Sequence, residues 1–210
     1  MAQYWLEIAS AADLDQLGVV TTGTLSYTTD GGIPVAVFNK TTAYGEYVRL
    51  LSVPSSSTIE VRCLLRQTAG GLGSSRVGPA VRISGDSAYV YGKNTSTTYK
   101  LGKRADGVSA ELGANVTGQP AGNTWSWLET RIEGTTLTAR SWEIGGSRPE
   151  SATRTVTDTS ISNGFAGFGG VFNDASDANL RIIAVGTDGD PAPTGPVGER
   201  QRSRLILTPW

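Results

Sequence analysis

The chain has no histidine, one cysteine and one methionine in its 210 residues. The absence of histidine excludes Ser-His-Asp and Cys-His nucleophilic catalysis, histidine ligation of a metal and a histidine-based pH switch. The single cysteine, Cys63, excludes an internal disulfide. Because Cys63 alternates with Val61 and Leu65 in a strand-like run, we expect a small buried apolar side chain and not a reactive thiol.

The chain also lacks an excess of either charge and any long apolar run. It carries 18 basic and 19 acidic residues, a net charge of -1, which gives no general attraction to nucleic acid or to an anionic membrane. No stretch approaches the roughly 18 apolar residues of a membrane span. The first residues, MAQYWLEIASAADLDQL, have neither a basic leader nor an unbroken apolar core, so we expect no secretory signal and synthesis in a cytoplasm.

Glycine is abundant, with 27 residues, and serine and threonine crowd between short apolar runs. This composition is typical of many turns and few helices. Alternation recurs, as in residues 58–66, where apolar Ile59 and Val61 share one face. Further strands are expected within residues 79–84, 88–91, 99–101, 128–133, 137–142, 165–172 and 180–185, and a short capped helical turn within residues 10–17. The sequence therefore predicts one all-β domain, an antiparallel two-sheet jelly-roll sandwich spanning residues 1–186.

The most informative run is residues 125–146, WSWLETRIEGTTLTARSWEIGG. It predicts two one-sided strands joined by a turn at Gly134, with three tryptophans at the strand ends. Trp125 and Trp127 share one alternation face, so at least one of them is expected to pack in the core.

The order of these segments resembles the concanavalin A-like lectin/glucanase (laminin-G-like) sandwich. The matching segments, within residues 45–186, are IEVR at 59–62, AVRI at 80–83, YKL at 99–101, WLETRIEG at 127–134, LTARSW at 137–142 and GFAGFG at 164–169. The resemblance implies a lectin-like jelly roll. Domains of this appearance without a secretion signal are similar to those of bacteriophage tail and capsid-surface proteins, so the resemblance also implies a place on the virion surface.

The same resemblance raises the alternative of a glycoside hydrolase, which needs two carboxylates about 5–10 Å apart around the scissile bond. The glucanases of this fold carry a Glu-x-Asp-x-Glu strand. In this chain Arg62 follows Glu60 at that spacing and Arg131 follows Glu129, so arginine stands where the second acid belongs. We interpret Glu129, Arg131 and Glu133 as part of a cross-strand charge ladder and expect no enzymatic activity.

Sugar binding requires aromatic faces for stacking beside polar groups that hold hydroxyls. The candidate residues are Trp142, Arg140, Tyr89, Tyr91 and Trp125. For each aromatic ring, packing in the core is the alternative interpretation.

Some lectins of this fold use calcium, for which loops rich in aspartate and asparagine supply oxygen ligands. The candidate ligands are Asn173, Asp174, Asp177 and Asn179, and Asp188 with Asp190. Such residues commonly form turns, so we expect no cofactor, with calcium as the alternative.

The composition changes after Val185. The stretch GTDGDPAPTGPVG holds three prolines and four glycines and is typical of an extended linker. A basic patch and an apolar end follow, formed by Arg200, Arg202 and Arg204 and by Leu205, Ile206, Leu207 and Trp210. We expect residues 187–210 to form a linker and a C-terminal arm that docks on a neighbouring subunit, with an edge strand or frayed tail as the alternative.

The leading hypothesis is a non-enzymatic bacteriophage virion structural protein, a tail-fibre, adhesion or capsid-decorating subunit whose lectin-like domain binds host-surface glycans. The expected partners are other virion proteins and further copies of the chain in a homo-oligomer, with no nucleic acid and no membrane. A carbohydrate-binding module is the second hypothesis and a glycoside hydrolase the third.

Overall fold

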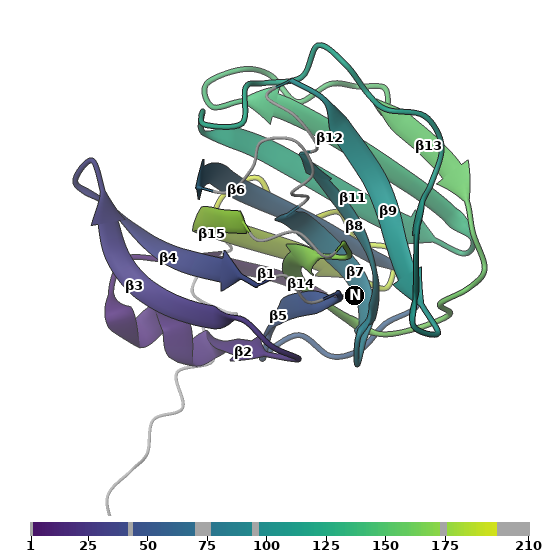
Figure 1. The fold of residues 1–210 in the computed structure, drawn as a ribbon, viewed down its shortest axis with the longest axis horizontal. Coiled ribbons are helices and arrows are strands. Elements are labelled where there is room, and N and C mark those ends of the chain that lie inside the picture. Colours follow the sequence, from purple (N-terminus) through teal and green to yellow (C-terminus); the bar gives the residue numbers. More distant parts are fainter. Residues whose placement is uncertain (1, 42–43, 70–76, 94–96, 173–175, 197–210) are drawn as a thin grey trace, which may run out of the picture.

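The computed structural model describes residues 2–41, 44–69, 77–93, 97–172 and 176–196, and within them two antiparallel sheets pack face to face (Figure 1). The helical content of this part is one 3-10 helix, η1 (Ala11–Gln16). Ser10 precedes it, and the Ser10 N–H donates to the Asp13 carboxylate at 2.8 Å, so the predicted helical turn is confirmed. No helix among the described residues is long and apolar enough to cross a membrane.

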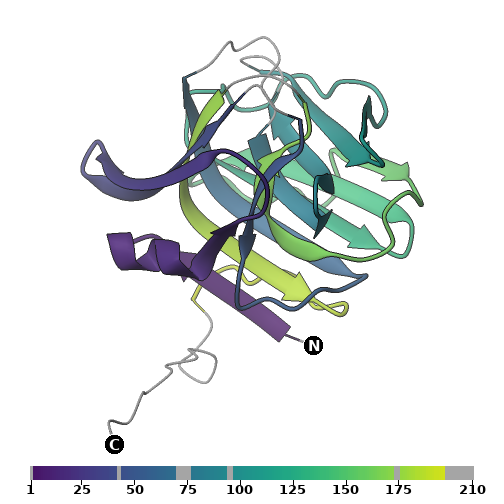
Figure 2. The same cartoon turned by 60° about the horizontal axis from the view of Figure 1, so that its bottom comes forward.

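The first sheet, sheet A, has the order β13-β12-β11-β6-β15-β4-β3, and β1 also pairs with β15. Its strands are β13 (Arg154–Thr157), β12 (Thr136–Glu143), β11 (Ser126–Glu133), β6 (Ile59–Ala69), β15 (Ser176–Thr187), β4 (Ile33–Lys40), β3 (Thr24–Asp30) and β1 (Ala2–Glu7). The long strand β15 pairs with β4 near its start and with β1 near its end, on the same edge. Figure 2 shows β1, in purple, beside the yellow end of β15.

The second sheet, sheet B, has the order β10-β9-β8-β7-β14-β5-β2. Its strands are β10 (Val108–Glu111), β9 (Tyr99–Ala105), β8 (Ser87–Lys93), β7 (Val77–Ser84), β14 (Phe165–Gly170), β5 (Glu46–Leu50) and β2 (Leu17–Val19). Strands β7 and β8 form a hairpin around Gly85, in which Ser84 pairs with Ser87.

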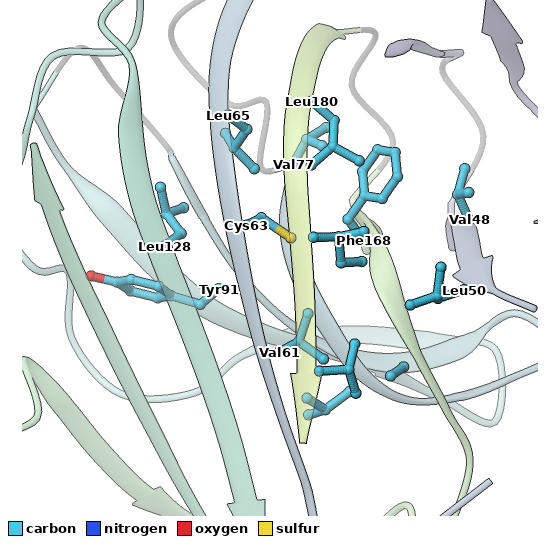
Figure 3. Packing of buried hydrophobic residues seen from close by; sticks show 14 of the residues in the cluster. Val48, Leu50, Val61, Cys63, Leu65, Val77, Tyr91, Leu128, Phe168 and Leu180 are labelled. Atoms are coloured by element: carbon cyan, nitrogen blue, oxygen red, sulfur yellow. The ribbon is translucent and has the colours of Figure 1, made fainter. Parts of the chain in front are cut away.

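The core lies between the sheets and follows the alternation seen in the sequence. Val61, Cys63 and Leu65 of β6 point into the core cluster that also holds Phe168 and Leu180 (Figure 3). Cys63 has no exposed surface, and burial raises the pKa of its thiol, so it is the buried apolar residue that the sequence predicts. Together with the strand order, this packing confirms the β-sandwich.

The hairpin of β11 and β12 confirms the interpretation of residues 125–146. Gly134 turns the chain with a φ of 58°, a value that favours glycine. Strands β1 to β4 form an N-terminal part of the fold that the sequence analysis does not place, because only short pieces of it alternate clearly.

Candidate functional site

Three tryptophans cross the outer face of sheet A, the face turned away from the core. Trp127 of β11 and Trp142 of β12 are directly paired, and their rings stack with centroids 6.1 Å apart and planes at 17°. Trp5 of β1 lies on the other side of Trp127, with ring centroids 6.4 Å apart. We call these three rings the tryptophan strip. Trp127 thus packs on the outer face and Trp125 is partly exposed, so the expectation that at least one of the two packs in the core is wrong.

Two apolar residues of the outer face line up with this strip. Leu64 of β6 is in register with Trp127 and with Ile182 of β15. Leu64 and Ile182 are 2% and 6% exposed although neither belongs to the core between the sheets. Apolar side chains on an outer face are stable when other apolar groups shield them from water. We therefore infer that Trp5 and Trp127 pack over Leu64 and Ile182 and are not free to bind a ligand.

A cluster of arginines and glutamates lies beside the strip. Glu129 is fully buried and accepts hydrogen bonds from Arg62 at 2.9 and 3.1 Å, from Arg140 at 2.8 Å and from Arg148 at 2.6 and 2.7 Å. Glu60 accepts from Arg62 at 3.3 Å. The strand register places Glu129 opposite both Arg62 and Arg140, so the predicted cross-strand charge ladder is confirmed.

The electrostatics of Glu129 favour a structural role. Burial raises the pKa of Glu129, but the hydrogen bond from Arg148 and the positive charge of Arg62 outweigh it and bring the pKa below its usual value. A general acid in glycoside hydrolysis needs a raised pKa. Glu129 therefore stays ionised and serves as the centre of the arginine cluster.

The segment after β15 closes over part of this cluster. The Ala192 N–H donates to Glu60 at 3.1 Å, and Arg62 donates to the Pro193 carbonyl at 3.2 Å. Gln3 donates to the Pro191 carbonyl at 2.8 Å. We call residues 191–193 the C-terminal strap. The predicted linker thus begins in contact with the sandwich, whereas all predicted arm residues from Arg200 to Trp210 lie outside the described residues.

A depression of about 540 Å³ opens where the tryptophan strip reaches the end of β12. This volume lies within the range of roughly 300–1,000 Å³ that is usual for small-ligand sites. It is lined by Thr97, Gly118, Gln119, Pro120, Ala121, Ser141, Trp142, Glu143, Pro149 and Thr153. Trp127 covers one face of the Trp142 ring. Trp142 can therefore line the depression only with the opposite face and the edge of its ring.

The depression borders an open edge of sheet A. Strand β13 pairs with β12 only as far as Ala139, whose carbonyl accepts from the Thr153 N–H at 2.9 Å. Alternate residues of a strand direct their backbone groups to the same side, so those of Ser141 also point toward this edge, whereas the Glu143 carbonyl accepts from the Gly146 N–H at 3.0 Å. Among the described strands, none pairs with residues 140–143 on that side.

The polar side chains of the depression are tied to the core. The hydroxyls of Tyr91 and Ser141 are 3.2 Å apart, and Ser141 donates in turn to the Gln119 side-chain oxygen. The Gln119 amide nitrogen donates to the Thr117 carbonyl at 3.0 Å. Burial raises the pKa of Tyr91 to about 12, so its hydroxyl stays neutral and fixes this chain of hydrogen bonds.

Of the predicted sugar-binding residues, Trp142 lines the depression, and Arg140 lies next to it with its guanidinium on Glu129. Trp125 is partly exposed and lies under Arg66, 5.7 Å from the ring centroid, outside the depression. For Tyr89 and Tyr91 the sugar-binding prediction is wrong and the alternative, packing in the core, is confirmed, because both rings are fully buried between the sheets.

Three residues of the depression, Gln119, Ser141 and Glu143, are not among those predicted from the sequence. Ser141 and Glu143 flank Trp142 in the chain, and this adjacency is a signal that the sequence offers. Gln119 comes from a loop 22 residues away from Ser141 and gives no such signal.

Two of the predicted calcium ligands, Asn179 and Asp188, have other partners. The Asn179 amide donates to Asp30 at 2.8 Å, and Asp188 accepts from the Ser56 hydroxyl at 2.9 Å. Asn173 and Asp174 lie outside the described residues. Within the described ranges, no group of three or more histidine, cysteine, aspartate or glutamate residues is placed to hold a metal ion.

Comparison with known proteins gives no match to a protein-family model and none to a curated protein sequence. Solved structures do match. The cellulose induced protein Cip1 superposes with a TM-score of 0.57 at 15% identity, covering 88% of this chain and 97% of Cip1. The exoplasmic/lumenal domain of VIP36, in a Ca²⁺/Man3GlcNAc-bound form, gives 0.52 at 10% identity, covering 87% and 89%.

A third similar structure is the CBM2 module of the evolved Dit of Lactobacillus casei BL23 phage J-1. It gives a TM-score of 0.50 at 10% identity and covers 87% of this chain and 93% of the module. At such low identity these likenesses establish the fold alone. They support the concanavalin A-like β-sandwich that the sequence resembles.

Proposed function

We propose that this chain binds carbohydrate, without cleaving it, in the depression beside Trp142. One observation carries the proposal: a single concavity combines an aromatic ring, the open backbone edge of β12 and the polar side chains of Gln119, Ser141 and Glu143. A sugar presents an apolar ring face and a rim of hydroxyls, so it suits a stacking surface surrounded by donors and acceptors.

The geometry of Trp142 supports this role over simple packing. Trp127 holds one face of its ring in a stacked arrangement, which orients Trp142 before any ligand arrives. Arg62 lies over the same indole at 5.7 Å and limits its motion further. A ring fixed in this way loses little conformational freedom on binding, which favours affinity.

The carboxylates of the site favour binding over hydrolysis. Glu143 is the one carboxylate among the lining residues, whereas the usual glycoside hydrolysis uses two, about 5–10 Å apart. Glu129 lies in the arginine cluster with a lowered pKa. We therefore propose a lectin-like binding domain and not an enzyme.

We propose further that the domain works as a subunit of a bacteriophage virion that contacts host-surface glycans. The likeness to a module of a phage Dit protein supports this setting, as does the sequence of the C-terminal arm. Removing residues 197–210 tests it while leaving the C-terminal strap intact. The truncated chain should lose oligomerisation or particle incorporation yet keep glycan binding. An unchanged oligomeric state by light scattering together with unchanged incorporation would contradict the docking arm.

The binding proposal is tested on a glycan array followed by calorimetry on the glycans that bind. Trp142→Ala and Gln119→Ala should each weaken binding at least tenfold. Tyr44→Ala is the matched control, because Tyr44 is an aromatic side chain, 46% exposed, outside the depression. Thermal unfolding of each variant separates loss of the site from loss of the fold. A blank array, or binding that survives both site variants, would overturn the proposal.

A further inference from the structure

The depression beside Trp142 carries one ionised group. Its polar lining consists of the hydroxyls of Thr97, Ser141 and Thr153, the amide of Gln119 and the exposed carboxylate of Glu143. No arginine or lysine is among the lining residues. A ligand placed there therefore meets a negative charge and otherwise neutral groups.

Three nearby arginines are directed elsewhere, and one of them, Arg154, follows Thr153 of the lining and donates to the carbonyl of Ala114. Arg140 precedes Ser141 in β12, and Arg148 precedes Pro149 of the lining, so both are adjacent in the chain to the depression. Both guanidiniums bind Glu129 on the outer face of sheet A, and Arg148 does so with two nitrogens. The charge of Arg140 and Arg148 is thus opposed by a buried carboxylate, whereas Glu143, at the end of β12, is exposed and lines the depression.

The hydrogen-bonding capacity of the depression is mixed. Glu143 supplies acceptor oxygens only, and the backbone of Ser141 supplies one donor and one acceptor at the open edge. Hydroxyls donate and accept, so they can satisfy both kinds of group. Ionised carboxylate, sulfate and phosphate groups are hydrogen-bond acceptors only. Because the Glu143 carboxylate is also an acceptor, no hydrogen bond could form between it and such a group.

We propose that the ligand is a neutral, hydroxyl-rich glycan and that Glu143 selects against uronates and against sulfated or phosphorylated sugars. This inference rests on the proposed function, since it names the class of sugar for the same site. Glu143 accepts hydrogen bonds from sugar hydroxyls and repels an anionic substituent. Two like charges about 4–5 Å apart repel by about 1 kcal/mol even in water, which corresponds to roughly fivefold in affinity.

The test compares matched oligosaccharides that differ in one substituent. Neutral oligosaccharides and the same compounds carrying a uronate, sulfate or phosphate are titrated into the full chain at low ionic strength, where charge effects are least screened. The wild type should bind each neutral compound at least fivefold more tightly than its anionic counterpart. Glu143→Gln should reduce this preference to about twofold or less, because glutamine keeps an acceptor oxygen and removes the charge.

A control variant, Arg148→Gln, tests whether a nearby arginine contributes to the preference. Arg148→Gln should leave the preference for neutral glycans unchanged if Glu143 sets it. Tighter binding of the anionic compounds by the wild type, or a preference that Glu143→Gln does not alter, would overturn this inference while leaving carbohydrate binding at Trp142 in place. Absence of binding to every compound would overturn the proposed function and this inference together.

Discussion

Replacing Glu129 with glutamine should strongly destabilise the sandwich. Glu129 has no exposed surface and accepts five hydrogen bonds from three arginines, one of which, Arg62, is itself only 4% exposed. Glutamine has nearly the same shape but no charge, so Arg62 would remain buried with its main counter-ion removed. Breaking a buried ion pair by removing one partner costs about 3–5 kcal/mol.

The expected change can be measured by unfolding in urea, followed through tryptophan fluorescence, because Trp127 and Trp142 lie on the same face as Glu129. Thermal unfolding gives a second readout. For a domain of this size, each kcal/mol of lost stability lowers the melting temperature by about 2–4 °C, so the melting temperature of Glu129→Gln should be about 6–20 °C below that of the wild type. Glu133→Gln is the control. Its side chain is 66% exposed and pairs with Arg131, so its loss should change the free energy of unfolding by about 0.5 kcal/mol or less.

The pH dependence of the same two proteins provides a second measurement. The folded pKa of Glu129 is lowered, so its contribution to stability is present above the unfolded value of about 4.3 and is lost as the pH falls through the folded value. Wild-type stability should therefore decline more steeply in acid than that of Glu129→Gln. A cost below about 1 kcal/mol, or an equal cost for Glu133→Gln, would refute the assignment of Glu129 as the centre of the cluster. Glycan hydrolysis abolished by Glu129→Gln would instead refute the non-enzymatic proposal.

Three further substitutions test other parts of the structure. Arg82→Lys should cost about 2–4 kcal/mol in urea unfolding, because the buried guanidinium donates to the carbonyls of Ile161 and Gly134, both at 2.6 Å, and an ammonium lacks the planar fork. Gly167→Ala should prevent stable folding, seen as loss of the cooperative melt, because a Cβ at that position would lie 1.9 Å from a backbone oxygen of β5. Burial raises the pKa of Asp158, but hydrogen bonds from Lys103 and others outweigh it and lower the pKa to about 2. Asp158→Asn should therefore flatten the loss of stability between about pH 5 and pH 1, and an unchanged acid curve would contradict this assignment.

The strands that the sequence predicts well are those with one face in the core. In β6 and β11, apolar residues alternate with charged ones. The charged side chains of the two strands lie opposite one another on the outer face of sheet A. The same alternation places Glu129, Arg131 and Glu133 on one face, and the structure sets Glu129 of that face opposite Arg62 of β6. In these two strands the alternation and the residue types indicate the same inward and outward faces, and the predicted strands are confirmed.

The error at Tyr89 and Tyr91 has a physical cause in β8. Tyr89 and Tyr91 point into the core between the sheets, while Ala88 and Val90 belong to a second apolar cluster with Tyr47. Both faces of this strand are therefore buried. Alternation distinguishes the two faces of a strand but does not reveal which face is covered by a second cluster, so it leaves both packing and sugar contact open for the tyrosines.

The candidate site depends on a difference in length between neighbouring strands, which explains why Trp142 could be predicted and its surroundings could not. Strand β12 has eight residues and β13 has four, so pairing stops at Ala139 and leaves the end of β12 open. An aromatic residue on a strand is visible in the sequence, whereas the absence of a partner beside it depends on where another segment ends. The loop that carries Gln119 then fills the side of the opening through Ser141. The depression is therefore a consequence of tertiary structure, and the ligand preference that we propose for it depends on Glu143, the one charged residue among those that line it.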